Sequence, residues 1–324
     1  MSTILVTGGA GYIGSHTTDA LIKKGHKVII VDDLSTGFEI LIHPKAKFYK
    51  QSILNTEALT EIMKQERVEG VIHFAAKIIV PESVAHPLEY YKNNTQGVIS
   101  TLLACKQAVV KYFVFSSTAV VYKGDSLEPL SEDLPLGSTS PYGSSKIFSE
   151  QIIRDCEIEF GLKSVILRYF NVAGASSNLK FGQLSKSSTH LIKIASETAC
   201  GKRSSMNLTG IDYPTPDGTG VRDYIHIEDL ADAHVLAIEH LQNGGTSNIF
   251  NCGYGHGSSV KEVIQAMKKV TGIDFKVIET IRRPGDVACL VANNEKIKRV
   301  LNWTPKRDNL ELICKSAYEW EKIN

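Results

Sequence analysis

A glycine-rich segment near the start of the chain constrains the fold more than any other feature. The apolar run Ile4-Leu5-Val6-Thr7 leads into Gly8-Gly9-Ala10-Gly11-Tyr12-Ile13-Gly14, and Gly8, Gly11 and Gly14 have the spacing Gly-x-x-Gly-x-x-Gly. Such glycines permit a tight turn and a close backbone approach to a diphosphate, and the following helix directs unpaired N–H groups at it. The segment therefore predicts the first strand, turn and helix of a dinucleotide-binding fold.

Short apolar runs alternate with longer amphipathic stretches, which is the pattern of repeated βαβ units. Because the runs are continuously apolar, they predict strands of a parallel sheet covered on both faces. The expected fold is therefore α/β, a doubly wound parallel (Rossmann) sheet with a smaller C-terminal substrate-binding α/β region. The runs are Ile4–Val6, Val28–Val31, Val71–Phe74, Phe113–Phe115 and Val165–Leu167, with helices expected near 12–24, 56–65, 88–109 and 141–160.

The pattern loosens after about Asn171, where the polar stretch Gly174-Ala175-Ser176-Ser177-Asn178 follows. We expect a dinucleotide-binding domain over residues 1–172 and a mainly substrate-binding domain over 173–324. Residues from about 225 to 255 are expected to return to the first domain. Helices of the second half are expected near 189–200, 228–241, 258–271 and 309–322.

Composition narrows the class of partner. With 36 basic and 35 acidic residues the chain has a formal charge of +1, which does not favour nucleic acid or an anionic membrane surface. The sequence shows no signal peptide and no apolar run of the roughly 18 residues that a membrane span requires. Six scattered cysteines without a Cys-x-x-Cys pair indicate thiols in the cytoplasm. The ten histidines form neither His-x-x-x-His nor His-Glu-x-x-His, so no metal site is expected.

An acidic residue ends the second expected strand. Asp32 lies eighteen residues after Gly14, where a carboxylate accepts hydrogen bonds from the adenosine ribose hydroxyls and repels a 2′-phosphate. This position favours NAD over NADP, whereas the adjacent Asp33 is also explained as a turn residue. Further along, the small residues of Phe74-Ala75-Ala76 follow the fourth strand, at the edge of the sheet where ligands of this fold lie.

A phenol and an ammonium share one face of an expected helix. Tyr142 and Lys146 are four positions apart in Pro141-Tyr142-Gly143-Ser144-Ser145-Lys146, so the Lys146 ammonium is expected to favour the Tyr142 phenolate. Ser140 has the character of an N-cap and Pro141 that of a first helical residue. Tyr-x-x-x-Lys alone is also typical of a surface helix, and the glycine segment is what gives it weight.

Hydroxyl residues end the fifth expected strand at Ser116-Ser117-Thr118. A hydroxyl there can bind a substrate hydroxyl or a developing oxyanion, although Ser and Thr at strand ends also satisfy local backbone groups. Thr118, Tyr142 and Lys146 together resemble the extended short-chain dehydrogenase/reductase superfamily, in which such residues orient the substrate, act as base and activate the base.

Longer motifs resemble one family of that superfamily, the UDP-glucose 4-epimerases, over nearly the whole chain. The most specific is Asp212-Tyr213-Pro214-Thr215-Pro216-Asp217-Gly218-Thr219-Gly220-Val221-Arg222-Asp223-Tyr224-Ile225-His226. Others are Thr7 to His16, His73-Phe74-Ala75-Ala76, Leu167-Arg168-Tyr169-Phe170-Asn171 and Arg282-Arg283-Pro284-Gly285-Asp286.

The resemblance implies a set of binding residues for NAD and a UDP-sugar. Arg222 and Arg283 also suit the diphosphate on physical grounds, because guanidinium groups make planar contacts with phosphate. Without the family pattern, surface ion pairing with Asp223 or Asp286 would explain them as well. The implied substrate contacts are Thr118, Tyr142, Asn171, His190, Leu191, Asn207, Leu208, Thr209, Arg222, Arg283, Asp286 and Leu290. The implied cofactor contacts are Gly8, Gly11, Tyr12, Ile13, Gly14, Asp32, Asp33, Leu34, Ser35, Thr36, Gly37, Ser52, Ile53, Phe74, Ala75, Ala76, Lys77, Asn93, Ser116, Tyr142, Lys146, Tyr169 and Phe170.

Three positions depart from the family pattern. Ser52 stands where members commonly have an acidic residue for the adenine, which implies weaker NAD binding. Lys77 does not align directly with the lysine that contacts the cofactor in other members, because its position in the sequence is shifted. Leu290 stands where some members have a bulky tyrosine that restricts substrates, so a smaller side chain could admit UDP-N-acetyl sugars.

The resemblance implies reversible 4-epimerisation of UDP-glucose and UDP-galactose, a step of galactose metabolism, with retained NAD. The Tyr142 phenolate would take the proton of the sugar 4′-hydroxyl while NAD⁺ removes hydride from C4′, and the 4-keto sugar would turn over before hydride returns. Lowering a tyrosine pKa from about 10 to near 7 takes about 4 kcal/mol, which we expect Lys146 and the nicotinamide to supply together.

Other functions stay open at this point. A 4,6-dehydratase would need acidic residues after Thr118, where Ala119 and Val120 stand. A UDP-glucuronate epimerase or decarboxylase would need a further cation, and a non-catalytic dinucleotide sensor would not need Tyr142. The family commonly forms dimers through two helices, so a homodimer is expected through apolar residues such as Val98, Leu102, Phe148 and Ile152, which core packing alone would also explain.

Overall fold

The computed structural model describes residues 1–123, 127–185, 188–283 and 286–324. Pro284 and Gly285 of the expected Arg-Arg-Pro-Gly-Asp motif lie outside the described residues. The chain divides into two compact units. The first contains 1–123, 135–168 and 231–250, and the second contains 124–134, 169–230 and 251–324. The assignment of an NAD-binding and a UDP-sugar-binding role to two domains stays a prediction.

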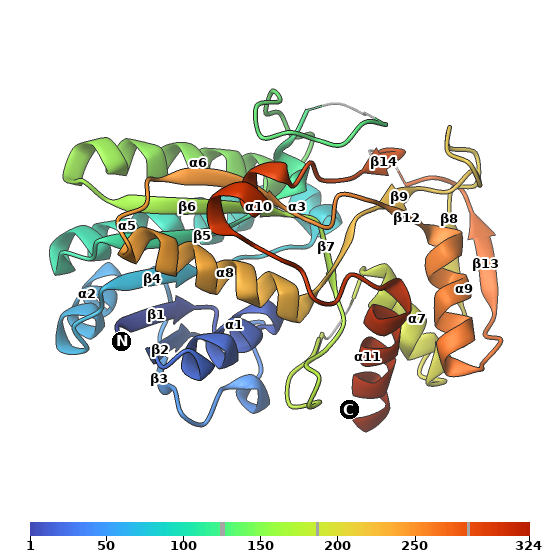
Figure 1. Ribbon diagram of the computed structural model, residues 1–324, viewed down its shortest axis with the longest axis horizontal. Helices are drawn as coiled ribbons and strands as arrows, with labels where there is room; N and C mark the ends of the chain where they lie inside the picture. Colours follow the sequence, from blue (N-terminus) through green and yellow to red (C-terminus); the bar gives the residue numbers. More distant parts are fainter. Residues whose placement is uncertain (124–126, 186–187, 284–285) are drawn as a thin grey trace. The chain divides into compact units, whose positions relative to one another are not determined.

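The first unit is built on a seven-stranded sheet with the order β11-β6-β5-β4-β1-β2-β3 (Figure 1). Strands β1 to β5 pair in parallel, with Thr7 beside both Val31 and His73. The strand order reverses between β1 and β4, and ligands of open α/β sheets bind outside such a reversal. The strands are β1 Thr3–Thr7, β2 Lys27–Asp32, β3 Lys47–Lys50, β4 Gly70–His73, β5 Tyr112–Thr118, β6 Lys163–Tyr169 and β11 Asn248–Cys252.

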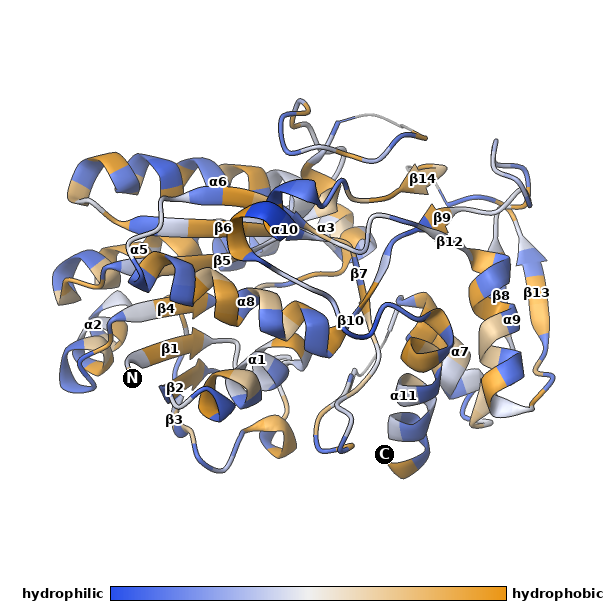
Figure 2. Ribbon diagram, in the orientation of Figure 1, coloured by the Kyte–Doolittle hydropathy of each residue, from blue (hydrophilic) through white to orange (hydrophobic). Residues whose placement is uncertain are grey.

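Helices cover both faces of this sheet, because its strands are apolar on both sides. One core cluster joins alternate strand residues such as Leu5 and Phe113 to Leu59, Leu102 and Ile153 of three helices. These helices are α2 Thr56–Gln65, α5 Gly97–Ala108 and α6 Pro141–Phe160. The opposite face is covered by α1 Tyr12–Lys23 and α8 Ile227–Gln242 (Figure 1). Figure 2 shows the middle of β1 as apolar, whereas α6 and α8 alternate between apolar and polar residues.

The helix before β5 is interrupted by a wider turn. It begins as α4 Pro87–Tyr90, continues as the π-helical segment η2 Tyr91–Gln96, and ends as α5. Segment η2 packs against α6, and π-helical turns occur often beside functional sites. A short helix α3, Val80–Ala85, precedes it, and the 3-10 segments η1 Glu39–Leu41 and η3 Ala119–Val121 follow β2 and β5.

The second unit consists of small sheets and flanking helices. Strand β7 (Asn171–Ala173) pairs with β10 (Tyr224–His226), and β8 (Met206–Thr209) pairs with β13 (Val277–Thr280). The third sheet has the order β12-β9-β14, with β9 Val221–Arg222, β12 Ser258–Ser259 and β14 Cys289–Leu290. The helices are α7 Leu191–Ala199, α9 Val260–Thr271, α10 Glu295–Leu301 and α11 Leu310–Ile323.

The structure confirms the expected doubly wound parallel sheet. Every expected strand and helix is present within a few residues, and α2 and α6 have the expected bounds. The sequence did not predict α3, α10 or the two- to four-residue strands of the second unit. Such strands are too short to show an alternating pattern.

Candidate functional site

The glycine loop after β1 is a cradle without side chains. Gly8 has a φ of +71°, and a Cβ atom on it would lie 2.7 Å from the backbone nitrogen of Ala75. A Cβ on Gly14 would lie 2.2 Å from the Gly8 carbonyl oxygen. Helix α1 begins here with Gly11 as its N-cap, without a side-chain cap and without an acidic residue in its first turn. The loop therefore presents backbone N–H groups and the positive end of a helix dipole, which suits a diphosphate.

A buried carboxylate faces this loop from the end of β2. The Asp32 side chain accepts hydrogen bonds from Ala10 N–H at 3.0 Å and from Leu34 N–H at 2.9 Å. Burial raises the pKa of Asp32, whereas these two N–H donors lower it. The loop after β2 closes over the carboxylate, because a Cβ on Gly37 would lie 2.9 Å from Asp32 Oδ1. These residues fit the ribose of NAD and would repel a 2′-phosphate.

The other residues of this loop are more exposed. Asp33 Oδ1 accepts a hydrogen bond from Ser35 N–H at 2.9 Å, as the turn interpretation predicts. Leu34 adopts the left-handed region with a φ of 61°, which is uncommon for a residue other than glycine. Ser35 and Thr36 are exposed.

The carboxyl end of β4 adjoins the glycine loop. Phe74, Ala75 and Ala76 are half-buried here. The Lys77 ammonium forms an ion pair with Glu89 at 2.6 Å. The Lys77 backbone is held by Asn94, which accepts from Lys77 N–H at 2.8 Å and donates to its carbonyl at 3.0 Å. Asn93, the expected cofactor contact, donates to Asn94 at 3.0 Å.

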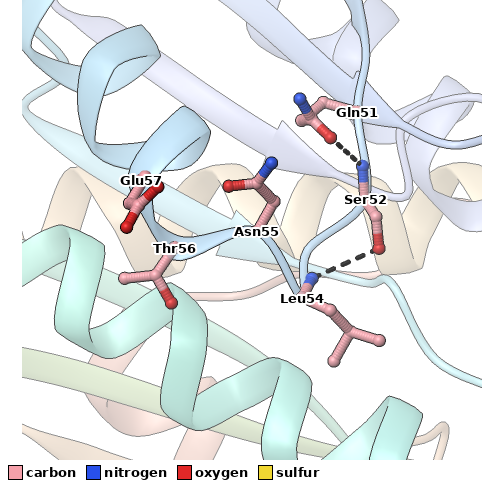
Figure 3. A pocket seen from close by; sticks show the side chains of 6 residues that line it. All are labelled: Gln51, Ser52, Leu54, Asn55, Thr56 and Glu57. Atoms are coloured by element: carbon pink, nitrogen blue, oxygen red, sulfur yellow. Dashed lines mark hydrogen bonds between the residues drawn. The ribbon is translucent and has the colours of Figure 1, made fainter.

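An open hollow of about 520 Å³ lies between the end of β3 and the start of α2 (Figure 3). Figure 3 shows the Gln51 side-chain oxygen accepting from Ser52 N–H, and the Ser52 hydroxyl accepting from Leu54 N–H. Ser52 therefore keeps its hydroxyl proton for a ligand, whereas a carboxylate in this position would only accept hydrogen bonds. Ile53 is buried in the core.

Tyr142 and Thr118 meet at the carboxyl end of the sheet. Helix α6 begins as expected, with Ser140 accepting from Gly143 N–H at 3.2 Å and Pro141 as the first residue. This places Tyr142 in the first turn, 9% exposed, where its hydroxyl is hydrogen-bonded to Thr118. Thr118 also caps η3 by accepting from Val120 N–H at 3.2 Å, so the local role that the sequence allowed is present as well.

Lys146 is buried one turn further along α6. Its Nζ donates to the Ser116 carbonyl at 2.8 Å and lies 4.8 Å from the centre of the Phe115 ring. Burial lowers the pKa of Lys146 to about 7, and the charge of Glu150 works in the opposite direction. Burial raises the pKa of Tyr142 to about 12, while the bond to Thr118 lowers it. The expected lowering of the Tyr142 pKa by Lys146 and the nicotinamide together concerns the complex with NAD and stays a prediction, while burial sets the direction of the shift in the protein alone.

Four expected substrate residues lie near one another in the second unit. Arg222 on β9 lies beside Leu290 of β14, and its guanidinium is 3.6 Å from the Asp286 carboxylate. Asn171 begins β7, where its N–H donates to the Asp223 carbonyl at 2.9 Å. The parallel pairing of β7 with β10 thus places Asn171 close in space to Arg222.

The other expected substrate residues lie on separate elements of the second unit. His190 is the N-cap of α7, and its Nδ1 is 2.7 Å from Gln183 Nε2. Asn207, Leu208 and Thr209 form β8, in which Leu208 is buried and Asn207 exposed. The remaining expected substrate residues are Leu191, half-buried at the start of α7, and Arg283, which is exposed. Two expected cofactor residues also lie in this unit: Tyr169, half-buried, ends β6, and Phe170, buried, follows it.

Several structural partners of these residues were not predicted. Asn94 links the Lys77 backbone to α6 by donating to Ser145 at 3.1 Å. Glu150 and Arg168 form a buried ion pair behind Lys146. Arg282 lies over the Tyr213 ring at 4.1 Å. The sequence held one usable signal, since a charged residue such as Arg168 at the end of an apolar strand needs a buried carboxylate partner.

No described helix is long and apolar enough to cross a membrane. Within the described ranges, no three His, Cys, Asp or Glu side chains gather as a metal site.

Comparisons with known proteins agree with this geometry. Residues 4–253 match the model of the NAD dependent epimerase/dehydratase family. The UDP-glucose 4-epimerase of Azospirillum brasilense is 48% identical over 98% of this chain and 92% of its own. The UDP-Glc/GlcNAc 4-epimerase structure from Campylobacter jejuni is 45% identical with a TM-score of 0.88 and covers 100% of both chains. The Bifidobacterium longum UDP-glucose 4-epimerase, solved with NAD⁺ and UDP, is 37% identical with a TM-score of 0.93 over 100% of this chain and 99% of its own. The chain therefore belongs to the NAD dependent epimerase/dehydratase family, and within it to the UDP-glucose 4-epimerases.

Proposed function

We propose that this chain reversibly interconverts UDP-glucose and UDP-galactose with retained NAD, and that Tyr142 is its base. One observation supports the assignment of the base: the Tyr142 hydroxyl is hydrogen-bonded to Thr118 at the carboxyl end of the sheet. The glycine loop follows a strand of the same sheet. NAD supplies the acceptor and donor of hydride at C4′ of the sugar. The chain supplies binding, orientation and proton transfer.

The glycine loop and Asp32 hold the cofactor in this proposal. Backbone N–H groups around Gly11 bind the diphosphate, Asp32 binds the adenosine ribose, and Ser52 donates to the adenine. The small residues Ala75 and Ala76 leave room at the end of β4, beside the glycine loop, where a Cβ on Gly8 would meet the Ala75 backbone. Lys77 is bound to Glu89, so we assign it no direct cofactor contact.

Tyr142 exchanges the proton of the sugar 4′-hydroxyl, and Thr118 orients that hydroxyl. Because the protein alone raises the Tyr142 pKa to about 12, ionisation of the phenol depends on the positive charge that oxidised NAD brings. Lys146 adds to this only while it is protonated. We infer that Tyr142 becomes active as a base only in the complex with oxidised NAD. Without the cofactor, Tyr142 then takes no proton from the sugar.

The diphosphate and uridine are assigned to the second unit. Arg222 binds the diphosphate. Its guanidinium is 3.6 Å from the Asp286 carboxylate, and a phosphate can replace that carboxylate as the partner of Arg222. Asn171, Arg283, Leu191 and the β8 strand complete the nucleotide site. Strong contacts to UDP and few to the hexose permit the 4-keto sugar to turn over while it stays bound.

Isotope retention tests the reaction. UDP-galactose labelled with deuterium at C4′ is incubated with the purified protein in ordinary water, without added NAD, and the UDP-glucose formed is analysed by mass spectrometry and NMR. We expect the deuterium to remain at C4′, because the same hydride returns to the carbon it left. Loss of the label to water would contradict the proposal, and so would a dehydrated product.

A second substrate class is favoured by Leu290. Its side chain is half-buried beside Arg222, and a Leu leaves more space than the tyrosine found in restricted members. The related Campylobacter jejuni structure is of a UDP-Glc/GlcNAc 4-epimerase. We infer that UDP-GlcNAc and UDP-GalNAc are accepted, and that Leu290→Tyr lowers N-acetyl turnover while UDP-glucose turnover stays within about twofold. Equal losses for both substrates would contradict this inference.

We also propose a homodimer that forms through α5 and α6. The expected residues Val98 and Leu102 are core residues, 1% and 2% exposed. The outer surface carries Ile99 and Leu103 of α5, 40% and 46% exposed, together with the expected Phe148 of α6, which is 51% exposed. These two helices pack against each other, so the three side chains can form one apolar face.

The cytoplasm is the compartment we propose. All six cysteines are free, and four of them are buried. Free thiols persist in a reducing compartment. Fractionation of the source cells tests this assignment. Recovery of the enzyme outside the cytoplasmic fraction would contradict it.

A further inference from the structure

A buried ion pair lies behind the proposed catalytic residues in the first unit. Arg168 of β6 and Glu150 of α6 are each 2% exposed. Arg168 Nη2 donates to Glu150 Oε2 at 2.6 Å, and Arg168 Nε donates to both carboxylate oxygens at 3.0 and 3.2 Å. Arg168 Nη1 also donates to the Tyr122 hydroxyl at 3.1 Å. Although burial works against its charge, the hydrogen bond and charge of Glu150 raise the pKa of Arg168.

The same carboxylate is joined to the residues around Lys146. Glu150 lies one turn beyond Lys146 on α6, so the two side chains share a face of the helix. Glu150 Oε1 accepts a hydrogen bond from the Ser117 hydroxyl. Ser117 directly follows Ser116, whose carbonyl oxygen accepts from Lys146 Nζ. Glu150 therefore fixes the strand that holds the ammonium, and Arg168 in turn fixes Glu150.

The remaining groups near Lys146 contribute little charge. His73 of β4 faces it, but burial lowers the pKa of His73 to about 3, with the charge of Lys146 as a smaller cause. His73 is therefore neutral where the enzyme works. The titratable or charged groups on the elements that pack against α6 are Glu82 of α3, Tyr90 and Glu89 of α4, Tyr91 and Lys92 of η2, Lys106 and Cys105 of α5, and Tyr112 of β5.

Most of these groups are already paired or neutral. Tyr90 donates to Glu82 at 2.8 Å, Glu89 is paired with Lys77, and Lys106 with Glu159. Glu150 is the carboxylate whose charge acts on Lys146.

We propose that Glu150 and Arg168 are positioning residues for the reaction: they hold the Lys146 ammonium on the Ser116 carbonyl and set the charge that Lys146 carries. Arg168 cancels part of the field of Glu150, so that Lys146 is poised between its charged and neutral forms. This inference rests on the proposed role of Lys146 beside Tyr142. Neither Glu150 nor Arg168 is assigned a contact with substrate or cofactor.

The charges can be removed one at a time. In Glu150→Gln, the Arg168 charge is left uncompensated beside Lys146, so Lys146 loses its proton more readily. We expect the alkaline limb of the kcat profile for UDP-galactose to move to lower pH by about one unit, with KM unchanged. In Glu150→Gln combined with Arg168→Met, both charges are absent, and the limb is expected to return most of the way to its wild-type position.

Two controls separate charge from structure. Glu159→Gln makes the same substitution on the same helix, in an exposed ion pair with Lys106, and is expected to leave the profile unchanged. Glu150→Asp keeps the charge on a shorter side chain, so kcat falls while the limb stays in place. This variant also tests the proposal where Glu150→Gln does not fold.

A second readout does not depend on turnover. The Lys146 Nζ resonance in ¹⁵N-lysine-labelled, NAD-loaded protein, assigned by its loss in Lys146→Arg, is expected to titrate at lower pH in Glu150→Gln than in wild type. The proposal is overturned if the limb and the resonance do not move in Glu150→Gln, if the double variant stays as shifted as the single one, or if Glu150→Asp shifts equally. An inactive wild type would instead contradict the proposed function itself.

Discussion

At the scale of single residues, two glycines with similar backbone angles distinguish an effect on cofactor binding from an effect on folding. Gly8 and Gly25 have φ values of +71° and +88°, but only Gly8 has atoms within 4 Å of a would-be Cβ. Alanine is strained at both positions, by about 1 kcal/mol. In Gly8→Ala the Cβ also pushes Ala75 out of the cradle, so we expect the purified protein to lose its NAD, whereas Gly25→Ala keeps it. Liquid chromatography of the released cofactor measures both, and equal NAD contents would contradict the assignment.

His73 connects a single residue to the pH dependence of stability. It is 1% exposed, its Nδ1 is 3.0 Å from the Thr7 hydroxyl, and burial lowers its pKa to about 3. In the unfolded chain the pKa is about 6.5, so unfolding takes up a proton between these values. The stability that a neutral His73 contributes is therefore complete above pH 6.5 and is lost as the pH falls toward 3.

His73→Gln tests this linkage, because a glutamine keeps a hydrogen-bonding group near Thr7 without titrating. Between pH 7 and pH 5 we expect the free energy of unfolding to fall by about 2 kcal/mol more in wild type than in the variant. Urea unfolding at the two pH values provides the comparison. An identical fall in both proteins would show that His73 does not carry the effect.

At the scale of elements, the start of α6 is the feature on which Tyr142 depends. Ser140 caps the helix by accepting from Gly143 N–H, and Asn309 caps α11 in the same way by accepting from Leu312 N–H at 2.9 Å. Replacing either residue by alanine is expected to cost about 1 kcal/mol of stability. Only Ser140→Ala frays the turn that holds Tyr142, so only this variant should also lose kcat. A normal kcat for Ser140→Ala at the same loss of stability would refute the dependence.

Elements with strong local signals could be predicted from sequence. Ser140 and Pro141 identify the first turn of α6, and continuous apolar runs identify the central strands. Helix α3 was missed because it has only six residues and Pro81 lies in its first turn. Strands such as β9 and β14 are defined by pairing between residues some seventy positions apart, Val221 with Cys289, which no local pattern contains.

At the scale of the whole molecule, the apolar face on α5 and α6 predicts assembly. Leu103→Glu combined with Phe148→Glu places two charges in the proposed interface, and we expect a monomer in sedimentation velocity where wild type is a dimer. Ile40→Glu changes an apolar residue on η1 that is more exposed still, at 68%, and is expected to leave the dimer intact. A monomeric wild type, or a dimeric double variant, would contradict the assembly.

The charges of the site are the part that could not be predicted from sequence. Tyr142 and Lys146 were identifiable by spacing, but burial raises one pKa and lowers the other, and burial depends on how α6 packs on β5. The partner of Lys77 was likewise unpredictable, since Glu89 approaches it only after η2 and α4 have folded. Long-range contacts of this kind determine which groups of a site are protonated, but no local sequence motif corresponds to them.

The central claim is that Tyr142 is the base of an epimerase that retains NAD. The direct measurement is the conversion of UDP-galactose to UDP-glucose by purified protein without added NAD, in wild type and in Tyr142→Phe with matched NAD content and thermal stability. We predict conversion by wild type and a loss of at least about a hundredfold in kcat for the variant, as removal of a general base causes. Conversion by Tyr142→Phe at close to the wild-type rate would contradict the account, as would a wild type that converts nothing even when NAD is added.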